Sequence, residues 1–143
     1  MKKNVFFRKA ISLAMCMTFA LAFFSGCDKD DDAKGGRNDY LGSWKITIER
    51  VGTIPTDADY TTTITASSTS NSDILINNIL NFGANYSVRA TISGNTFVIP
   101  QQTIQGVSFS GSGTRNGNSM SYSVSVVETG YAAVNWSVEC IKM

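Results

Sequence analysis

Alternation of apolar and polar residues with a period of two dominates the chain from residue 40 onward. The clearest example places Met120, Tyr122, Val124 and Val126 on one side of a segment and four serines on the other. This period is typical of a β-strand with one buried face and one wet face. No window of ten or more residues in this part shows the 3.6-residue period of an amphipathic helix. The pattern therefore predicts an all-β domain.

About eight strands follow from the alternation and the turn residues between the segments. Asn116-Gly117 is typical of a type I′ turn, which needs positive φ at both central residues. We expect Pro100 to end one strand, because proline cannot donate to the ladder, and Gly111 and Gly113 to bend the next. The strands are expected at residues 44–48, 60–66, 74–76, 86–92, 96–99, 107–113, 120–126 and 134–140.

Regular strand spacing with tight turns predicts an antiparallel meander. The meander either closes as a barrel or folds as a β-sandwich, and we favour the barrel because closure leaves no open strand edge. In the first strand, Trp44, Ile46 and Ile48 are expected to face inward. By the same parity, Glu49 and Glu139 are expected to be solvated surface charges.

Aromatic residues offer three interpretations. Core packing is the one we favour, because each buried aromatic removes on the order of 150–250 Å² from water. An interior ligand is the second, since an eight-stranded barrel is just wide enough for one small molecule. The third is a shallow rim site for sugars, formed by Phe82 and Tyr131 with Asn81 and Asn85. The residues with inward parity are Trp44, Tyr60, Tyr86, Tyr122 and Trp136.

The start of the first strand carries a family motif. Gly42 and Trp44 resemble the glycine–any residue–tryptophan motif that opens lipocalin-like domains. The resemblance implies an indole packed across one barrel end, with Gly42 and Trp44 as barrel-end residues. Trp136 is expected in the core from its inward parity on the last strand. Two further lipocalin signatures are missing, namely a threonine–aspartate–aromatic turn and an arginine on the last strand. The chain thus resembles small lipocalin-like lipoprotein domains more than the lipocalins proper.

The N-terminal segment has the three parts of a lipoprotein signal peptide. A basic start is followed by an uncharged apolar run over residues 11–24 and then by Ser25-Gly26-Cys27. The run is shorter than the roughly 20 residues that span a bilayer, so cleavage before Cys27 is favoured over a membrane anchor. We expect a signal peptide at 1–26, an acylated, flexible, acidic tether at 27–39 and the β domain at 40–143.

The tether contains a second motif. Lys29, Asp30 and Asp31, close behind Cys27, resemble the export signal of Bacteroidetes-type surface lipoproteins. This resemblance implies an outer-membrane lipoprotein that faces the cell exterior. A periplasm-facing position remains the alternative, because acidic tethers are common.

Charge and residue usage exclude several function classes. From Cys27 onward the chain has eight Lys and Arg against eleven Asp and Glu, which argues against a nucleic-acid partner. The chain has no histidine, and therefore lacks the usual general base and the commonest metal ligand. Cys140 is the one cysteine left after cleavage and acylation, so we expect a buried free thiol. We expect no enzyme activity, no cofactor and no metal.

These observations together predict an outer-membrane lipoprotein that acts as a non-catalytic binding module. Its partner is expected to be a small apolar molecule, a glycan or a protein. The alternative is a structural or interaction subunit, or an inhibitor, in an outer-membrane complex. The sequence does not choose between these partners.

Overall fold

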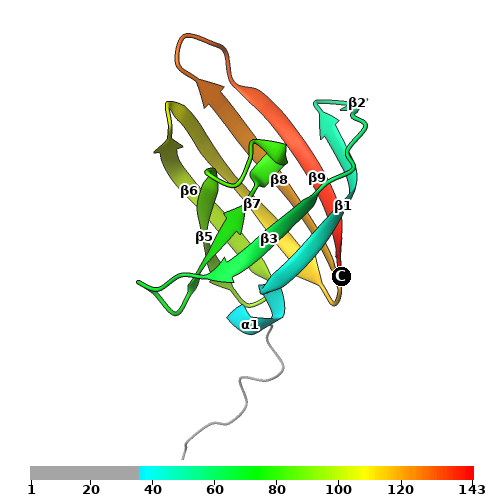
Figure 1. Ribbon diagram of the computed structural model, residues 1–143, viewed down its shortest axis with the longest axis vertical. Helices are drawn as coiled ribbons and strands as arrows, with labels where there is room; N and C mark the ends of the chain where they lie inside the picture. Colours follow the sequence, from blue (N-terminus) through cyan, green and yellow to red (C-terminus); the bar gives the residue numbers. More distant parts are fainter. Residues whose placement is uncertain (1–35) are drawn as a thin grey trace, which may run out of the picture. The chain divides into compact units, whose positions relative to one another are not determined.

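The alternating segments form strands in the computed structural model, which describes residues 36–143. Eight strands form an antiparallel meander, and the first strand also pairs with the last, so the sheet closes as a barrel (Figure 1). The barrel expected from the sequence is confirmed. The elements are α1 (Arg37–Tyr40), β1 (Gly42–Val51), β2 (Ile54–Pro55), β3 (Thr61–Ala66), β4 (Asp73–Asn77), the 3-10 helix η2 (Ile79–Asn81), β5 (Ser87–Ser93), β6 (Thr96–Ile104), β7 (Val107–Asn116), β8 (Ser119–Glu128) and β9 (Val134–Lys142).

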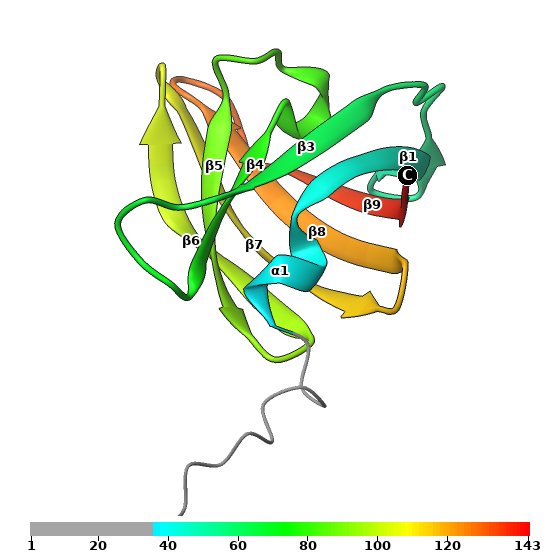
Figure 2. The same ribbon diagram turned by 60° about the horizontal axis from the view of Figure 1, so that its bottom comes forward.

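The barrel has two different ends. The end that we call proximal carries α1, the β5–β6 turn and the β7–β8 turn, and Figure 2 shows α1 at this mouth. The opposite end, called distal, carries the β1–β2 turn, η2, the β6–β7 turn and the β8–β9 loop (Figure 1). No helix within residues 36–143 is long and apolar enough to cross a membrane.

Side chains from every barrel strand fill the interior. Trp44, Phe97 and Phe109 are the bulkiest strand residues among the fully buried side chains, and each is at most 1% exposed. Gly113 faces Phe97 and Tyr122, and a Cβ added at Gly113 would lie 2.3 Å from the Phe97 Cζ atom. Glycine at this inward position therefore makes room for the ring of Phe97 and the Cβ of Tyr122.

A β-bulge in β1 overturns the expected orientation of Ile48 and Glu49. The pairing with β9 advances from Ile46 to Ile48 while β9 advances by a single residue, so Thr47 is the extra residue. A bulge reverses the alternation beyond it. Ile48 consequently lies outside the core, whereas Glu49 is buried at 6% exposure and is not a surface charge. Glu139 is exposed, as expected.

Pro100 does not end its strand. β6 continues to Ile104, and its pairing with β7 shifts by one residue between Ile99 and Gln102. Proline is tolerated at a bulge because the backbone there has no ladder bond to donate. The irregularity expected at Gly111 thus lies on the neighbouring strand, while β7 pairs with β8 without a shift.

Three smaller features also differ from expectation. The β7–β8 turn is centred on Gly117 and Asn118, and only Gly117 has positive φ, which is the pattern of a type II′ turn. The segment around Pro55, expected to be a loop, adds the short edge strand β2 beside β1. Residues Arg37–Tyr40 form α1 against the barrel, so the ordered domain begins before the boundary expected at residue 40.

Candidate functional site

Packed aromatic and cationic side chains cover the proximal end. Trp44 is fully buried, and its Nε1 donates a hydrogen bond to the carbonyl oxygen of Tyr40 at 2.8 Å. The ammonium of Lys142, on β9, lies 5.7 Å from the centroid of the indole. Arg115 holds α1 in place through its 3.0 Å ion pair with Asp39. This end is therefore closed by structural contacts.

Gly42 and Trp136, expected at the barrel end and in the core, lie at the start of β1 and on β9. Gly42 has a φ of 119°, a conformation that side-chain-bearing residues rarely adopt, so its glycine is required for the entry into β1. Trp136 is half-buried and packs against the core from β9. Cys27, Lys29, Asp30 and Asp31 lie outside the described residues.

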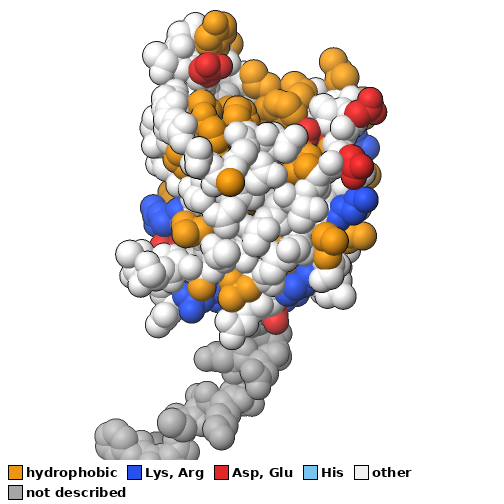
Figure 3. Space-filling model, viewed as in Figure 1, with side chains coloured by type: hydrophobic (Ala, Val, Ile, Leu, Met, Phe, Trp, Pro, Cys, Tyr) orange, Lys and Arg blue, Asp and Glu red, His pale blue; other side chains and the backbone are white. Residues whose placement is uncertain are grey.

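Exposed apolar side chains gather at the distal end. Eight large hydrophobic residues in the described part of the chain are exposed, and five of them belong to this end. We call these five the distal rim. Figure 3 shows hydrophobic side chains collected at the upper end of the barrel, opposite α1. The distal rim consists of Ile54 (69% exposed), Phe82 (38%), Val127 (37%), Tyr131 (72%) and Val134 (40%).

The loop that presents Phe82 has an unusual backbone. Asn78, Leu80 and Asn81 all have positive φ, at 60°, 49° and 58°. Leucine in the left-handed region costs roughly 1–2 kcal/mol, so surrounding contacts must hold it there. Leu80 is buried, and the Oδ1 atom of Asn78 accepts a hydrogen bond from the backbone N–H of Gly83 at 2.9 Å. Strain of this kind is concentrated at binding and active sites.

Contacts beneath the loop fix its position on the barrel. The Phe82 ring stacks edge-on against Phe109 at 5.7 Å and tilts against Tyr86 at 5.2 Å. Gln105, in the β6–β7 turn, donates from Nε2 to the carbonyl oxygen of Asn85 at 3.5 Å, which joins two loops of the distal end. Phe82 is thus held in place by contacts with Phe109 and Tyr86, while 38% of the residue remains exposed to solvent.

The carboxyl group of Glu49 is buried below the distal end, although the strand parity predicts it on the surface. Glu49 accepts a hydrogen bond from the Tyr60 hydroxyl and another, at 2.8 Å, from the Thr56 hydroxyl. Burial, followed by the hydrogen bond to Glu49, raises the pKa of Tyr60 well above its usual value. These bonds attach the link between β2 and β3 to β1. Thr47, the extra residue of the bulge, is not a glycine or another residue that marks a bulge in a sequence. The hydrophobic periodicity therefore could not indicate that Glu49 is buried.

Two further polar groups lie in the same interior. Tyr122 is 3% exposed, and its hydroxyl has no hydrogen-bond partner among the described residues. Burial also raises the pKa of the Cys140 thiol to about 12, and its Sγ lies 3.5 Å from the carbonyl oxygen of Met120. The free, buried thiol expected from the sequence is confirmed within the described residues.

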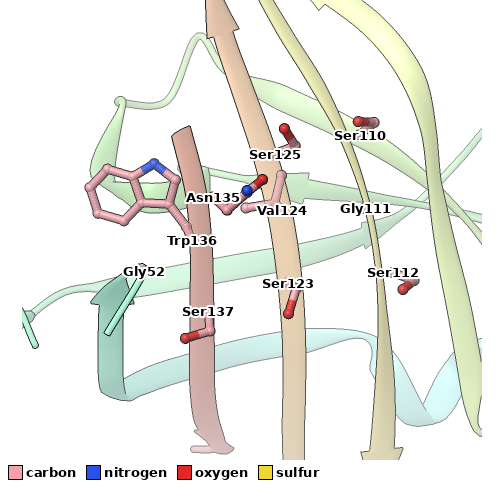
Figure 4. A pocket seen from close by; sticks show the side chains of 10 residues that line it. All are labelled: Gly52, Ser110, Gly111, Ser112, Ser123, Val124, Ser125, Asn135, Trp136 and Ser137. Carbon is pink, nitrogen blue, oxygen red and sulfur yellow. The ribbon is translucent and has the colours of Figure 1, made fainter. Parts of the chain in front are cut away.

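A shallow depression of about 460 Å³ lies on the outer wall of β7, β8 and β9. Figure 4 shows its side chains, which are mainly the short hydroxyl groups of serine. A Cβ at Gly111 would lie 2.1 Å from the carbonyl oxygen of Ser123, so glycine allows β7 to dip toward β8 here. Two more depressions, of about 320 and 490 Å³, continue along the same wall. Distal-rim side chains line none of the three.

The glycine-rich run Ser110-Gly111-Ser112-Gly113 is part of strand β7. Within residues 36–143, no group of three or more His, Cys, Asp or Glu side chains is arranged to hold a metal ion. The distal rim presents apolar and aromatic side chains to solvent. Comparisons of this chain with protein-family models, with curated proteins and with solved structures found no match.

Proposed function

We propose that this chain is an outer-membrane lipoprotein, displayed on the cell surface, that acts as a non-catalytic binding module. The binding face is the distal rim. The observation that supports this most directly is the gathering of five exposed apolar side chains at one end of the barrel. Exposed apolar groups that collect in one region mark interaction sites, whereas scattered ones need no explanation.

The position of the rim suits a tethered protein. The described chain begins at α1, on the proximal end, which is where a lipid-anchored tether would join the domain. A tether attached there leaves the distal end facing away from the membrane. Arg115 and Lys142 contact Asp39, so the junction is held firmly to the barrel. The domain would then present Phe82 and Tyr131 outward.

Photo-crosslinking in cells that produce the chain tests this assignment. Tyr131 is replaced by p-benzoylphenylalanine, and the matched control carries the same group at Val98, which is 55% exposed on the barrel wall. We expect a specific crosslinked product at position 131 that is absent at position 98. Phe82→Ala, added to the position-131 variant, should reduce the product. Equal products at both positions would refute the rim as the binding face.

A further inference from the structure

Strands β5 and β6 are paired over part of their length. Within residues 36–143 their ladder stops at Thr91, although β5 begins at Ser87 and β6 continues to Ile104. The outer neighbours stay paired here, because β4 follows β5 to Ser87 and β7 follows β6 to Ile104. We call the unpaired stretch, residues 87–90 of β5 and 99–104 of β6, the seam. The ladder pairs that do form are Thr91 with Val98, Ile92 with Phe97 and Ser93 with Thr96.

Pro100 explains why the ladder stops. Two residues beyond the pair of Thr91 and Val98, the same register would set Arg89 opposite Pro100. In an antiparallel ladder every second residue points its N–H and C=O to the same neighbour, and the intervening Ile92 donates to the segment before β4. Arg89 therefore offers both groups to β6, whereas proline has no N–H to donate in return. The carbonyl oxygen of Arg89 needs another donor.

The side-chain amide of Gln102 takes the place of the missing main-chain partner. Its Nε2 donates to the carbonyl oxygen of Arg89 at 2.7 Å, and its Oε1 accepts from the N–H of Arg89 at 2.9 Å. Nε2 also donates to the carbonyl oxygen of Pro100 at 3.0 Å. An amide that pairs with both main-chain groups of one residue makes the contacts of a peptide unit in a neighbouring strand. Gln102 thus occupies a position suited to one residue of another strand.

Ser87 and Thr103 direct further main-chain groups into the seam. Ser87 has the parity of Arg89, so its N–H and C=O face β6. On β6, Ile104 and Val107 close a two-residue turn and bond to each other, which directs the N–H and C=O of Thr103 toward β5. No ladder pair in the described part of the chain joins these groups across the seam. Unpaired main-chain groups along a strand edge are a template for another strand.

Aromatic rings lie on the inner side of the seam. Tyr86 directly precedes β5, and Phe109 faces inward from β7, the neighbour of β6. Their ring centroids are 6.1 Å apart, and Phe82 packs against them at 5.2 and 5.7 Å. On the outer side, the side chains of Arg89 and Thr103 are exposed. A strand added here would therefore have one apolar face and one wet face.

We propose that the seam binds an extended polypeptide segment, whose main chain pairs with β5 and displaces the side-chain amide of Gln102. In recognition by strand addition, main-chain hydrogen bonds provide affinity and alternate side chains provide specificity. The apolar side chains of the segment contact Phe82 and Tyr86, and its polar side chains face solvent. This inference goes beyond the proposed function, because its binding groups are the main chain of β5 and β6. The crosslink at position 131 tests the rim separately, so either proposal can fail alone.

Peptides with a blocked main chain test the proposal. The probe is a capped, fluorescein-labelled heptapeptide of alternating valine and threonine, and two analogues carry N-methyl groups on its valines or on its threonines. The protein is the chain from residue 27 with Cys27→Ser, which keeps the tether but not the lipid. Fluorescence anisotropy should show that at least one analogue binds about tenfold more weakly than the parent, because it cannot donate to the seam. Equal binding of all three peptides, or binding of none, would overturn the proposal.

Variants of the seam locate the peptide. Gln102→Ala should tighten binding about threefold or more, because the competing amide is gone. Thr103→Pro removes an N–H that faces the seam and should weaken binding, and Thr103→Val, which keeps that N–H, should bind more tightly than Thr103→Pro. Circular dichroism verifies that each variant is folded. Unchanged or weaker binding to Gln102→Ala would overturn the displacement of Gln102.

Hydrogen exchange followed by NMR gives a readout at the main chain itself. In Gln102→Ala the amide of Arg89 should exchange faster than in the wild type, and the parent peptide should restore its protection. The amide of Thr91, which is paired with Val98, is the internal control. Peptide binding that leaves Arg89 unprotected would place the peptide elsewhere and overturn the proposal. Protection that rises with protein concentration without peptide would assign the seam to a second copy of the chain, which also overturns it.

Discussion

Trp44 and Tyr40 are joined by a 2.8 Å hydrogen bond from the indole Nε1 to the carbonyl oxygen, which links β1 to the turn that covers the proximal end. Both side chains are fully buried. Trp44→Ala should lower the free energy of unfolding by about 3–5 kcal/mol, because it leaves a large cavity and an unpaired carbonyl. Urea denaturation measures this loss. Tyr131→Ala, at a 72% exposed position, should change stability by less than about 0.5 kcal/mol. An unchanged midpoint for Trp44→Ala would contradict the buried indole.

Glu49 gives a test of the β1 bulge. Glu49→Ala should destabilise the domain by about 1–3 kcal/mol, because the hydroxyls of Tyr60 and Thr56 lose their acceptor. Glu49→Gln keeps an acceptor oxygen and should cost less. Glu139→Ala is the control, since that side chain is exposed and its ion pair with Arg50 is long at 3.9 Å. Similar losses for Glu49→Ala and Glu139→Ala would place both carboxyl groups in solvent.

Cys140 predicts a loss of stability at alkaline pH. Burial raises its pKa from 9.0 to about 12, so the folded domain holds the thiol proton that the unfolded chain releases. This contribution is complete below pH 9.0 and is lost as the pH rises from 9.0 to about 12. The free energy of unfolding of the wild type should therefore fall more steeply than that of Cys140→Ala as the pH rises from 9.0 to about 12. A parallel decline in both proteins would refute the linkage.

Accessibility of the same thiol provides an independent measurement. A thiol reagent should modify Cys140 only after the domain is denatured, because the residue is 1% exposed. Rapid labelling of the native chain that begins at residue 27 and carries Cys27→Ser, so that Cys140 is its one thiol, would contradict the inward position of Cys140 on β9.

Cys27 is predicted to be the acylated first residue of the mature protein. Cells grown with a radioactive fatty acid should label the wild type but not Cys27→Ala, because the thiol is the acyl acceptor. Membrane fractionation should show the same difference. Label that persists in the variant would contradict the lipoprotein prediction.

Surface display is predicted from Lys29, Asp30 and Asp31. Protease added to intact cells should remove the domain in the wild type, whereas replacing these three residues with alanine should protect it. A control digestion after cell lysis should degrade both proteins equally. Equal protection of both proteins in intact cells would indicate that the wild type faces the periplasm.

Local pattern was sufficient for the β class of the domain and for most inward rows. The serines between Met120, Tyr122 and Val124 alternate so regularly that one register alone buries the apolar set. Gly42 and Trp44 likewise indicate where the first strand begins. These features depend on residues close in sequence, whose period and turn chemistry act without help from distant strands.

Only the tertiary structure decided the features that depend on the pairing partner. The bulge at Thr47 exists because β1 must match β9 across the closure, and it turns Glu49 inward against the local alternation. Pro100 stays within β6 because it lies at a bulge, where no ladder hydrogen bond requires the N–H that proline lacks. The distal rim is the same kind of result. Ile54, Phe82 and Tyr131 are far apart in the sequence, and the antiparallel meander places their loops at one end of the barrel. Closure then brings the β1–β2 turn to β9, where Gly52 donates a hydrogen bond to the carbonyl oxygen of Asn135.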